Sequence, residues 1–216
     1  MNSNIILIVL GEPNSTFSEI LFRYFKSNNF KKNTNRIVII GSKKLFKEQM
    51  KILKYNFHLN EISDINRSIK TKINIINVEY KFKKAFTKIS GISNKYLENC
   101  FNLAIKLIKI NNLNKLINGP ISKTHFLKKK FVGITEYVGF KTNRKKLVML
   151  IYNDTLSVCP LTTHIPIKNV AKYIKKNKII NSVNKIDKFY KLKLRKIPKI
   201  ALLGLNPHCE TTDKIS

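Results

Sequence analysis

The sequence has no tryptophan, few glycines (7) and prolines (6), and only 12 acidic residues among 216. Apolar residues nevertheless make up 43% and charged residues 25%, so the composition is that of a globular chain and excludes a disordered one. No strictly apolar run exceeds six residues, the length of Ile5–Leu10, which is too short to cross a bilayer. That run also lacks the preceding cationic segment of a signal peptide, so we expect a soluble, cytoplasmic protein.

Cysteine is also scarce. The three cysteines, Cys100, Cys159 and Cys209, are odd in number and far apart, which excludes a disulfide framework and a Cys-x-x-Cys metal site. Cys209 adjoins His208, but adjacent residues at a strand end point in different directions, so we do not expect a catalytic pair. The glycine-rich fingerprints of dinucleotide- and nucleotide-binding loops and the Gly-x-Ser-x-Gly elbow of hydrolases are missing as well.

The excess of cations over acids, 42 against 12, gives a formal net charge of +30. Such a charge is typical of proteins that bind nucleic acids or anionic membranes, and a nucleic-acid binder would show steeply salt-dependent affinity. Only five of the cations are arginine, however, the side chain that reads phosphates and bases with a bidentate fork. Lysine, asparagine and isoleucine, all with A/T-rich codons, are enriched along the whole chain. We therefore interpret the charge as compositional bias on a solvated surface and expect neither a nucleic-acid nor a membrane partner.

Short β-branched apolar runs predict the buried strands of a parallel sheet. Three such runs lie in the first half of the chain: Ile5–Leu10, Arg36–Ile40 and Lys72–Val78. Between the first two, Thr16 and Glu19 have the spacing of a capping box, which predicts the start of a helix. The alternation of strands and helices indicates an α/β fold with a mainly parallel, doubly wound sheet.

The second half of the chain continues this alternation. Apolar residues three and four apart predict a helix from Ser93 onward, and Val170–Leu194 has a lysine-rich helical pattern. Leu147–Tyr152 and Thr155–Leu161 are predicted as two strands joined by a turn, and Ile200–Leu203 as a last strand. No repeat, linker or change of composition marks a domain boundary.

Histidines in the loops after strands are candidate ligands, because ligands of such folds gather at the carboxyl ends of the strands. His164 and His208 each follow a predicted strand in a loop stiffened by a neighbouring proline. They are therefore candidate ligands of a divalent metal, although a single loop histidine is more often solvated. We assign His58 and His125 to that solvated class.

The Gly119-Pro120 turn has two interpretations. Its backbone N–H groups and Lys123 can bind a phosphate, or it is an ordinary turn between a strand and a helix. Composition alone favours the ordinary turn.

Five motifs in the sequence form a pattern together. They are Gly11-Glu12-Pro13, Gly119-Pro120-Ile121-x-Lys123, Gly133-x-Thr135-Glu136, Thr162-Thr163-His164-x-Pro166 and Gly204-Leu205-Asn206-Pro207-His208. In order and spacing they resemble the 4-hydroxythreonine-4-phosphate dehydrogenases of vitamin B6 biosynthesis, and the resemblance extends from the N-terminus to about His208.

This resemblance implies a homodimer of two-domain α/β chains like isocitrate and isopropylmalate dehydrogenases, with the active site at the dimer interface. Such enzymes oxidise 4-phosphooxy-L-threonine with NAD or NADP and a divalent cation such as zinc, magnesium or cobalt. The β-keto acid then loses carbon dioxide and gives 3-amino-2-oxopropyl phosphate. By position, His164 and His208 match two of the three metal-binding histidines, and Thr135 matches a substrate contact. The cation polarises the hydroxyl group that is oxidised.

Three departures from the family pattern are visible. Ile134 stands where the family usually has histidine, Cys209–Asp213 replaces a glycine-rich stretch, and the sequence stops at Ser216 although the family continues for a further third. We therefore interpret residues 1–216 as the N-terminal portion, without the C-terminal third that carries the third metal histidine and much of the NAD site. The alternatives are a dehydrogenase of threonate or erythronate 4-phosphate, and a catalytically incomplete remnant if the chain truly ends there.

Overall fold

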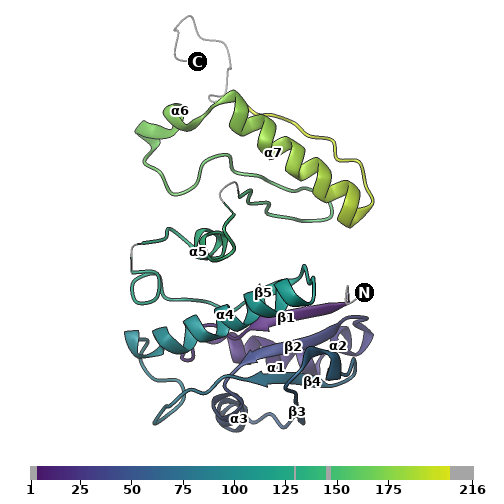
Figure 1. Ribbon diagram of the computed structural model, residues 1–216, viewed down its shortest axis with the longest axis vertical. Helices are drawn as coiled ribbons and strands as arrows, with labels where there is room; N and C mark the ends of the chain where they lie inside the picture. The colour runs from purple at the N-terminus through teal and green to yellow at the C-terminus, as the bar shows by residue number, and fades with distance from the viewer. Residues whose placement is uncertain (1–3, 129, 145–146, 205–216) are drawn as a thin grey trace, which may run out of the picture. The chain divides into compact units, whose positions relative to one another are not determined.

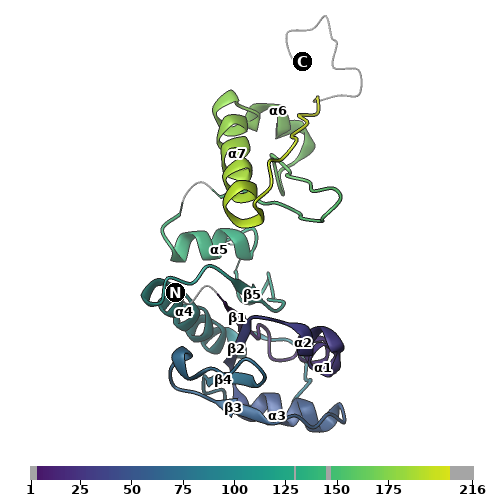
Figure 2. The same cartoon turned by 90° about the vertical axis from the view of Figure 1, so that its right-hand side faces the viewer.

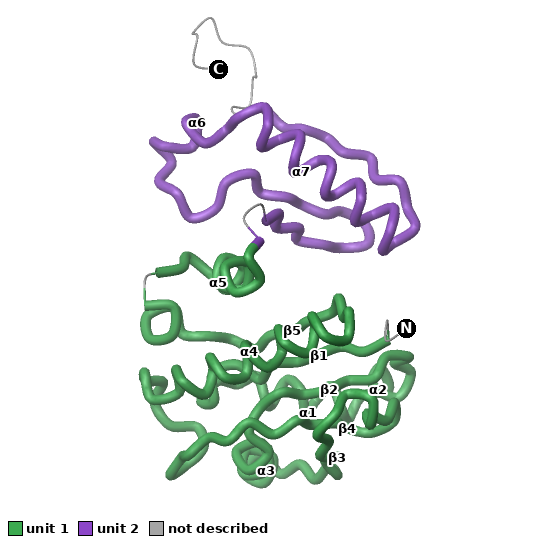
Figure 3. The backbone as a smooth tube through the Cα atoms, viewed as in Figure 1, with its two compact units in different colours: residues 1–143 green, residues 144–216 purple. Residues whose placement is uncertain are grey.

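The computed structural model describes residues 4–128, 130–144 and 147–204, and the chain divides into two units, residues 1–143 and 144–216 (Figure 3). The first unit contains a parallel sheet of five strands in the order β3-β4-β2-β1-β5. The strands are β1 (Ile5–Val9), β2 (Arg36–Gly41), β3 (Leu59–Glu61), β4 (Ile73–Asn77) and β5 (Leu116–Asn118). The predicted α/β architecture is confirmed, as are the three predicted strands of the first half.

Helices cover both faces of this sheet. They are α1 (Phe17–Lys26), α2 (Asn28–Lys32), α3 (Lys43–Ile52), α4 (Asn94–Ile110) and α5 (Ile134–Lys141). Leu7 and Val9 of β1 share a core with α4 and α5, whereas Ile8 shares the opposite core with α1 and α3. Figures 1 and 2 show α4 on one side of the strands and α1 on the other. Because successive side chains of a strand point to opposite faces, a strand with helices on both faces is apolar throughout.

The helix starts show how local sequence selects these boundaries. α1 begins directly after Thr16, as the capping-box spacing predicts, but within the described chain the Thr16 side chain makes no capping hydrogen bond. Glu19 instead pairs with Arg23 at 2.7 Å. α3 is capped by Ser42, whose hydroxyl accepts a hydrogen bond from the backbone N–H of Leu45.

The second unit is helical where helix was predicted. It contains a 3₁₀ turn (Ile167–Asn169), α6 (Val170–Tyr173), α7 (Lys176–Phe189) and a final π-helical turn (Tyr190–Leu194). The predicted helix over 170–194 is thus confirmed, with a break at Ile174, where the backbone is extended. Among the residues that the structure describes, no helix is long and apolar enough to cross a membrane.

The strands predicted in the second unit are wrong. Within Leu147–Tyr152 and Thr155–Leu161 the described chain forms only one antiparallel bridge, in which Ile151 and Val158 exchange N–H···O bonds of 2.8 and 2.9 Å. Residues 200–203 form no strand in the described chain, and Leu203 is 88% exposed. An apolar run becomes a strand only where a neighbouring strand offers a hydrogen-bonding edge, and the described part of this unit offers none.

Limited proteolysis is expected to digest the second unit before the first. All buried apolar residues of the described chain lie between Ile5 and Tyr137, and no residue between 147 and 204 is buried. Because local opening is easiest where little apolar surface is buried, we expect cleavage in the second unit to be about tenfold faster or more. Intact-mass analysis of a timed digest should show a resistant fragment that ends near Asn143; simultaneous loss of both units would contradict this expectation.

Candidate functional site

The first two sequence motifs meet at the carboxyl ends of neighbouring strands. Gly11-Glu12-Pro13 follows β1, Gly119-Pro120 follows β5, and these two strands pair in parallel. The Gly119 N–H donates to the Val9 carbonyl and the Glu12 N–H donates to the Pro120 carbonyl, each at 2.8 Å. Two segments more than 100 residues apart in sequence therefore form one rigid double loop at the edge where ligands of parallel sheets bind.

Both glycines are required by the closeness of these loops. Gly11 has a φ of +73°, and a Cβ atom there would lie 2.5 Å from the Pro120 carbonyl oxygen. A Cβ atom at Gly119 would lie 2.3 Å from the Leu10 carbonyl oxygen. Glycine at these positions thus allows the backbones of the two loops to lie in contact, because a side chain would hold them apart.

The phosphate interpretation of the Gly119-Pro120 turn gains no support from this geometry. The Gly119 N–H is already bonded to Val9, and proline has no N–H to offer. The turn is followed by further turns over residues 123–126 rather than by a helix, and His125 lies in these turns. Lys123 is exposed.

Glu12 is a buried carboxyl group in the middle of the double loop. It is 3% exposed, and its Oε2 accepts a 2.8 Å hydrogen bond from the Ser93 hydroxyl. Its Oε1 is buried without a hydrogen-bond partner among the described residues. Burial raises the pKa of Glu12 above its ordinary value, and the bonds from Ser93 and from the Asn14 backbone offset this only in part.

Replacing Glu12 with glutamine is expected to stabilise the first unit at neutral pH by about 1 kcal/mol, because the amide removes a buried charge and keeps an oxygen that can accept the Ser93 hydrogen bond. Since the pKa is raised in the folded state, the folded chain binds the proton more tightly than the unfolded chain does. Wild-type stability should therefore fall as pH rises from about 4.5 through the raised pKa, and this dependence should be weaker in Glu12→Gln. Urea unfolding of both proteins at pH 4 to 8 measures the free energy of unfolding and its dependence on pH. Glu48→Gln, at an exposed carboxylate, is the control, and an equal or lower stability of Glu12→Gln at neutral pH would contradict the expectation.

Several polar residues around Glu12 were not singled out by the sequence analysis. Ser93 holds Glu12, the Asn94 amide donates to the His125 carbonyl at 2.9 Å, and Asn14 accepts a 3.0 Å bond from the Thr87 N–H. Gln49 on α3 donates to the Pro13 carbonyl at 2.6 Å. These contacts join segments that are far apart in sequence, so no local sequence pattern predicts them.

The third motif is fixed to the same core. Gly133 precedes α5, and Thr135 is the second residue of this helix and half-buried. The helix is held by Tyr137, whose ring lies 5.1 Å from that of Phe126 and 5.4 Å from that of Phe101 on α4. Three of the five motifs therefore lie on one folded unit.

The packing of Ile134 explains why an apolar residue stands at this position. Its side chain packs against the core that contains β1 and α4 and is partly buried. An isoleucine at this position thus contributes to packing, whereas the imidazole usual in the family would carry a polar atom to this place.

The last two motifs lie in the second unit. His164 is exposed and has a φ of +58°, a left-handed conformation that is uncommon for histidine. His208, together with Cys209, lies outside the residues that the structure describes. Within the described ranges no group of three His, Cys, Asp or Glu side chains is close enough to hold a metal ion. Among the residues that the structure describes, His164 is thus a single available imidazole.

The surroundings of the described cysteines do not favour the thiolate form. Burial raises the pKa of Cys100 to about 12, and burial also raises the pKa of Cys159. A thiol with a raised pKa is protonated at neutral pH and is a poor nucleophile.

Comparison with known proteins gives a consistent result. The family model described as pyridoxal phosphate biosynthetic protein PdxA matches residues 33–213. A 4-hydroxythreonine-4-phosphate dehydrogenase of Sulfurihydrogenibium sp. (strain YO3AOP1) is 34% identical over 216 residues, 97% of this chain and 65% of that protein. The enzyme of the same name from Aquifex aeolicus is 30% identical and is covered to 62%.

A relative with a different name is also similar. A putative D-threonate 4-phosphate dehydrogenase of Fusobacterium nucleatum is 24% identical over 94% of this chain. Among solved structures, a putative 4-hydroxythreonine-4-phosphate dehydrogenase from Salmonella typhimurium has a TM-score of 0.81 at 22% identity, over 96% of this chain and 65% of that one. The chain therefore spans a little under two thirds of the length of the first of these relatives.

Proposed function

The chain belongs to the pyridoxal phosphate biosynthetic protein PdxA family, and from this premise we propose that the protein oxidises 4-phosphooxy-L-threonine with NAD or NADP in pyridoxal phosphate biosynthesis. NAD or NADP, when bound, would accept a hydride from the carbon that bears the hydroxyl group, and the proton of that group would pass to water. The β-keto acid then loses carbon dioxide and leaves 3-amino-2-oxopropyl phosphate. The observation that carries this proposal is the family match over residues 33–213.

Thr135 is proposed as the substrate contact. Its position in the first turn of α5 supports this role, because a hydroxyl group and unpaired backbone N–H groups are available together there. The packing of Tyr137 against Phe101 and Phe126 holds α5 in place. The binding of a ligand at α5 therefore costs little conformational entropy.

His164 and His208 are proposed as metal ligands, with zinc, magnesium or cobalt as the candidate cations. His164 fits this role as an exposed imidazole in a loop that Pro166 stiffens. A cation bound there supplies Lewis acidity to the substrate hydroxyl group. A homodimer with the site at the subunit interface, and a cytoplasmic location, complete the proposal.

Ile134→His is expected to lower the KM for 4-phosphooxy-L-threonine about threefold or more with little change in kcat, because an imidazole adds a hydrogen bond to the bound substrate. Steady-state kinetics of NAD(P)H formation measure it, with Ile134→Leu as the apolar control. An unchanged or higher KM would mean that substrate binding at this site relies on the isoleucine that packs against the core.

A dehydrogenase of D-threonate 4-phosphate is the second candidate. Two observations favour it: the similarity to a Fusobacterium nucleatum protein of that name, and the apolar Ile134 beside the proposed substrate contact. The two substrates differ at the carbon next to the carboxylate, which bears an amino group in one and a hydroxyl group in the other.

The experiment that tests the proposal compares kcat/KM for these substrates and for erythronate 4-phosphate, each with NAD and NADP. The proposal expects 4-phosphooxy-L-threonine to be preferred by about tenfold or more, which corresponds to about 1.4 kcal/mol. A preference for D-threonate 4-phosphate would establish the second candidate. Inactivity toward all three substrates, measured on the protein as its own cell produces it, would overturn both.

A further inference from the structure

A hollow of about 800 Å³ lies in the first unit between α3 and the segment that leads to β3. This volume is typical of small-molecule sites, which span about 300 to 1,000 Å³. None of the residues assigned above to substrate or metal lines it. The hollow therefore is a separate feature of the molecule.

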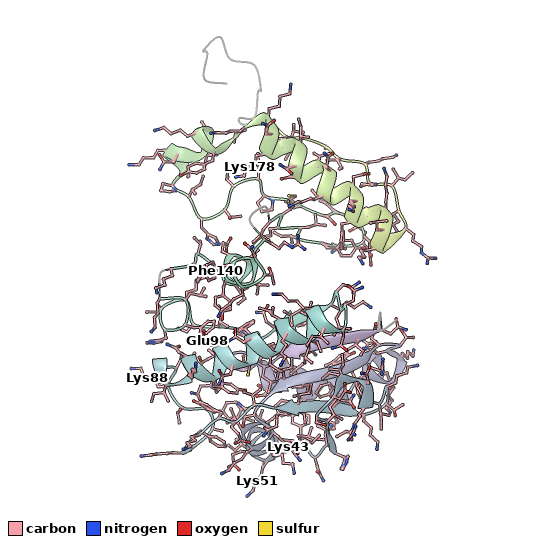
Figure 4. All side chains as sticks on the ribbon, in the orientation of Figure 1. Lys43, Lys51, Lys88, Glu98, Phe140 and Lys178 are labelled. Atoms are coloured by element: carbon pink, nitrogen blue, oxygen red, sulfur yellow. The ribbon has the colours of Figure 1, made fainter. Side chains whose placement is uncertain are left out.

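One wall of the hollow is a row of lysines. Lys43, Lys47 and Lys51 line it from α3, and their spacing of four residues places them along one face of the helix. Figure 4 labels the first and the last of them. The Lys43 ammonium pairs with Glu61 at 2.5 Å, whereas Lys47 and Lys51 form no ion pair with any residue that the structure describes. Within the described chain, two of the three ammonium groups at the hollow are thus not engaged in an ion pair.

Two aromatic residues, Tyr55 and Phe57, also line the hollow and form its aromatic wall. The rings of Tyr55 and Phe57 are stacked, with centroids 5.7 Å apart and an angle of 18° between their planes, and both side chains are partly exposed. Phe22 of α1 packs against Tyr55 from within the core at 5.4 Å. This support fixes the aromatic wall, and a fixed flat surface favours stacking of a planar ring.

We propose that this hollow binds a nucleoside polyphosphate, with its linked phosphates on Lys47 and Lys51 and its base against Tyr55. Lysines spread over the whole surface are explained by composition, but Lys43, Lys47 and Lys51 line a cavity of ligand size that also has an aromatic wall. A ligand that consists of phosphates alone would leave the aromatic side chains exposed to water. An apolar ligand alone would form no ion pair with Lys47 and Lys51.

Calorimetric titration of the 216-residue chain with ATP, inorganic tripolyphosphate and adenosine tests the proposal. EDTA is present, so that metal-dependent sites contribute nothing. ATP is expected to bind about tenfold more tightly than tripolyphosphate, since stacking of one base contributes about 1–3 kcal/mol. Adenosine alone should bind far more weakly than ATP.

Variants separate this site from the general positive charge of the chain. Lys47→Gln/Lys51→Gln is expected to weaken ATP binding about tenfold or more, and Lys83→Gln/Lys84→Gln, at two exposed lysines away from the hollow, by less than about twofold. Tyr55→Leu should reduce the affinity for ATP but not for tripolyphosphate. Thr135→Ala should leave ATP binding intact, which separates this proposal from the dehydrogenase site. Equal losses in the two lysine pairs, or equal affinity for ATP and tripolyphosphate, would overturn the nucleotide assignment.

Discussion

Gly119→Ala is expected to lower the free energy of unfolding of the first unit by about 3 kcal/mol, because the added methyl group has no space. Its Cβ atom would lie 2.3 Å from the Leu10 carbonyl oxygen and 2.6 Å from a ring carbon of Phe17. The nearer of these atoms is backbone of the segment that leaves β1, so relief requires the two loops to separate. Separation would also break the bonds from Gly119 to Val9 and from Glu12 to Pro120.

Gly91→Ala is the matched control for this experiment. The nearest atom to a Cβ there is the Asn94 amide nitrogen at 3.5 Å, which is an ordinary contact. Urea unfolding monitored by circular dichroism should give a change below about 0.5 kcal/mol for the control. Similar stabilities of Gly119→Ala and Gly91→Ala would show that the double loop tolerates separation and does not organise this edge of the sheet.

In the protein as its own cell produces it, His164→Ala is expected to abolish metal-dependent NAD(P)H formation, a loss of about a hundredfold or more, while the first unit keeps its stability. The side chain is exposed in the second unit, so its removal deletes no packing within the described chain. A metal titration followed together with the rate distinguishes a lost ligand from a lost fold. His208→Ala is expected to behave in the same way.

Lys168→Ala is the control for the histidine variants, since this exposed side chain follows His164 by four residues. Its activity should be that of the wild type. Full activity in His164→Ala would show that the metal assignment is wrong, even if the dehydrogenase assignment is right.

Much of the sheet could be predicted because three of its strands are visible as short apolar segments of the sequence. β1, β2 and β4 are apolar runs with helices on both faces, and α4 has a stripe of apolar residues with buried Leu97, Phe101 and Ala104. β3 was not predicted, since its sequence Leu-Asn-Glu has no apolar run and becomes a strand only by pairing with β4. The prediction of a strand at 200–203 is wrong for the opposite reason. The apolar run is present there, but the described chain offers no strand edge with which it could pair.

The site could be predicted only in part. The motifs that contain Gly11 and Gly119 were visible in the sequence, but their contact depends on β1 and β5 being neighbours. Ser93, which donates to Glu12 across 81 residues, belongs to no motif and could not be found without the fold. His164 and His208 stay predictions, because the structure describes only the first of them.

We propose above that the protein oxidises 4-phosphooxy-L-threonine. The most direct measurement takes the protein as its own cell produces it, determines its intact mass, and follows NAD(P)H and carbon dioxide released from 4-phosphooxy-L-threonine. We expect equal amounts of both products in the presence of a divalent cation and none in EDTA. No NAD(P)H above background with any divalent cation, from a protein whose first unit is folded, would contradict it.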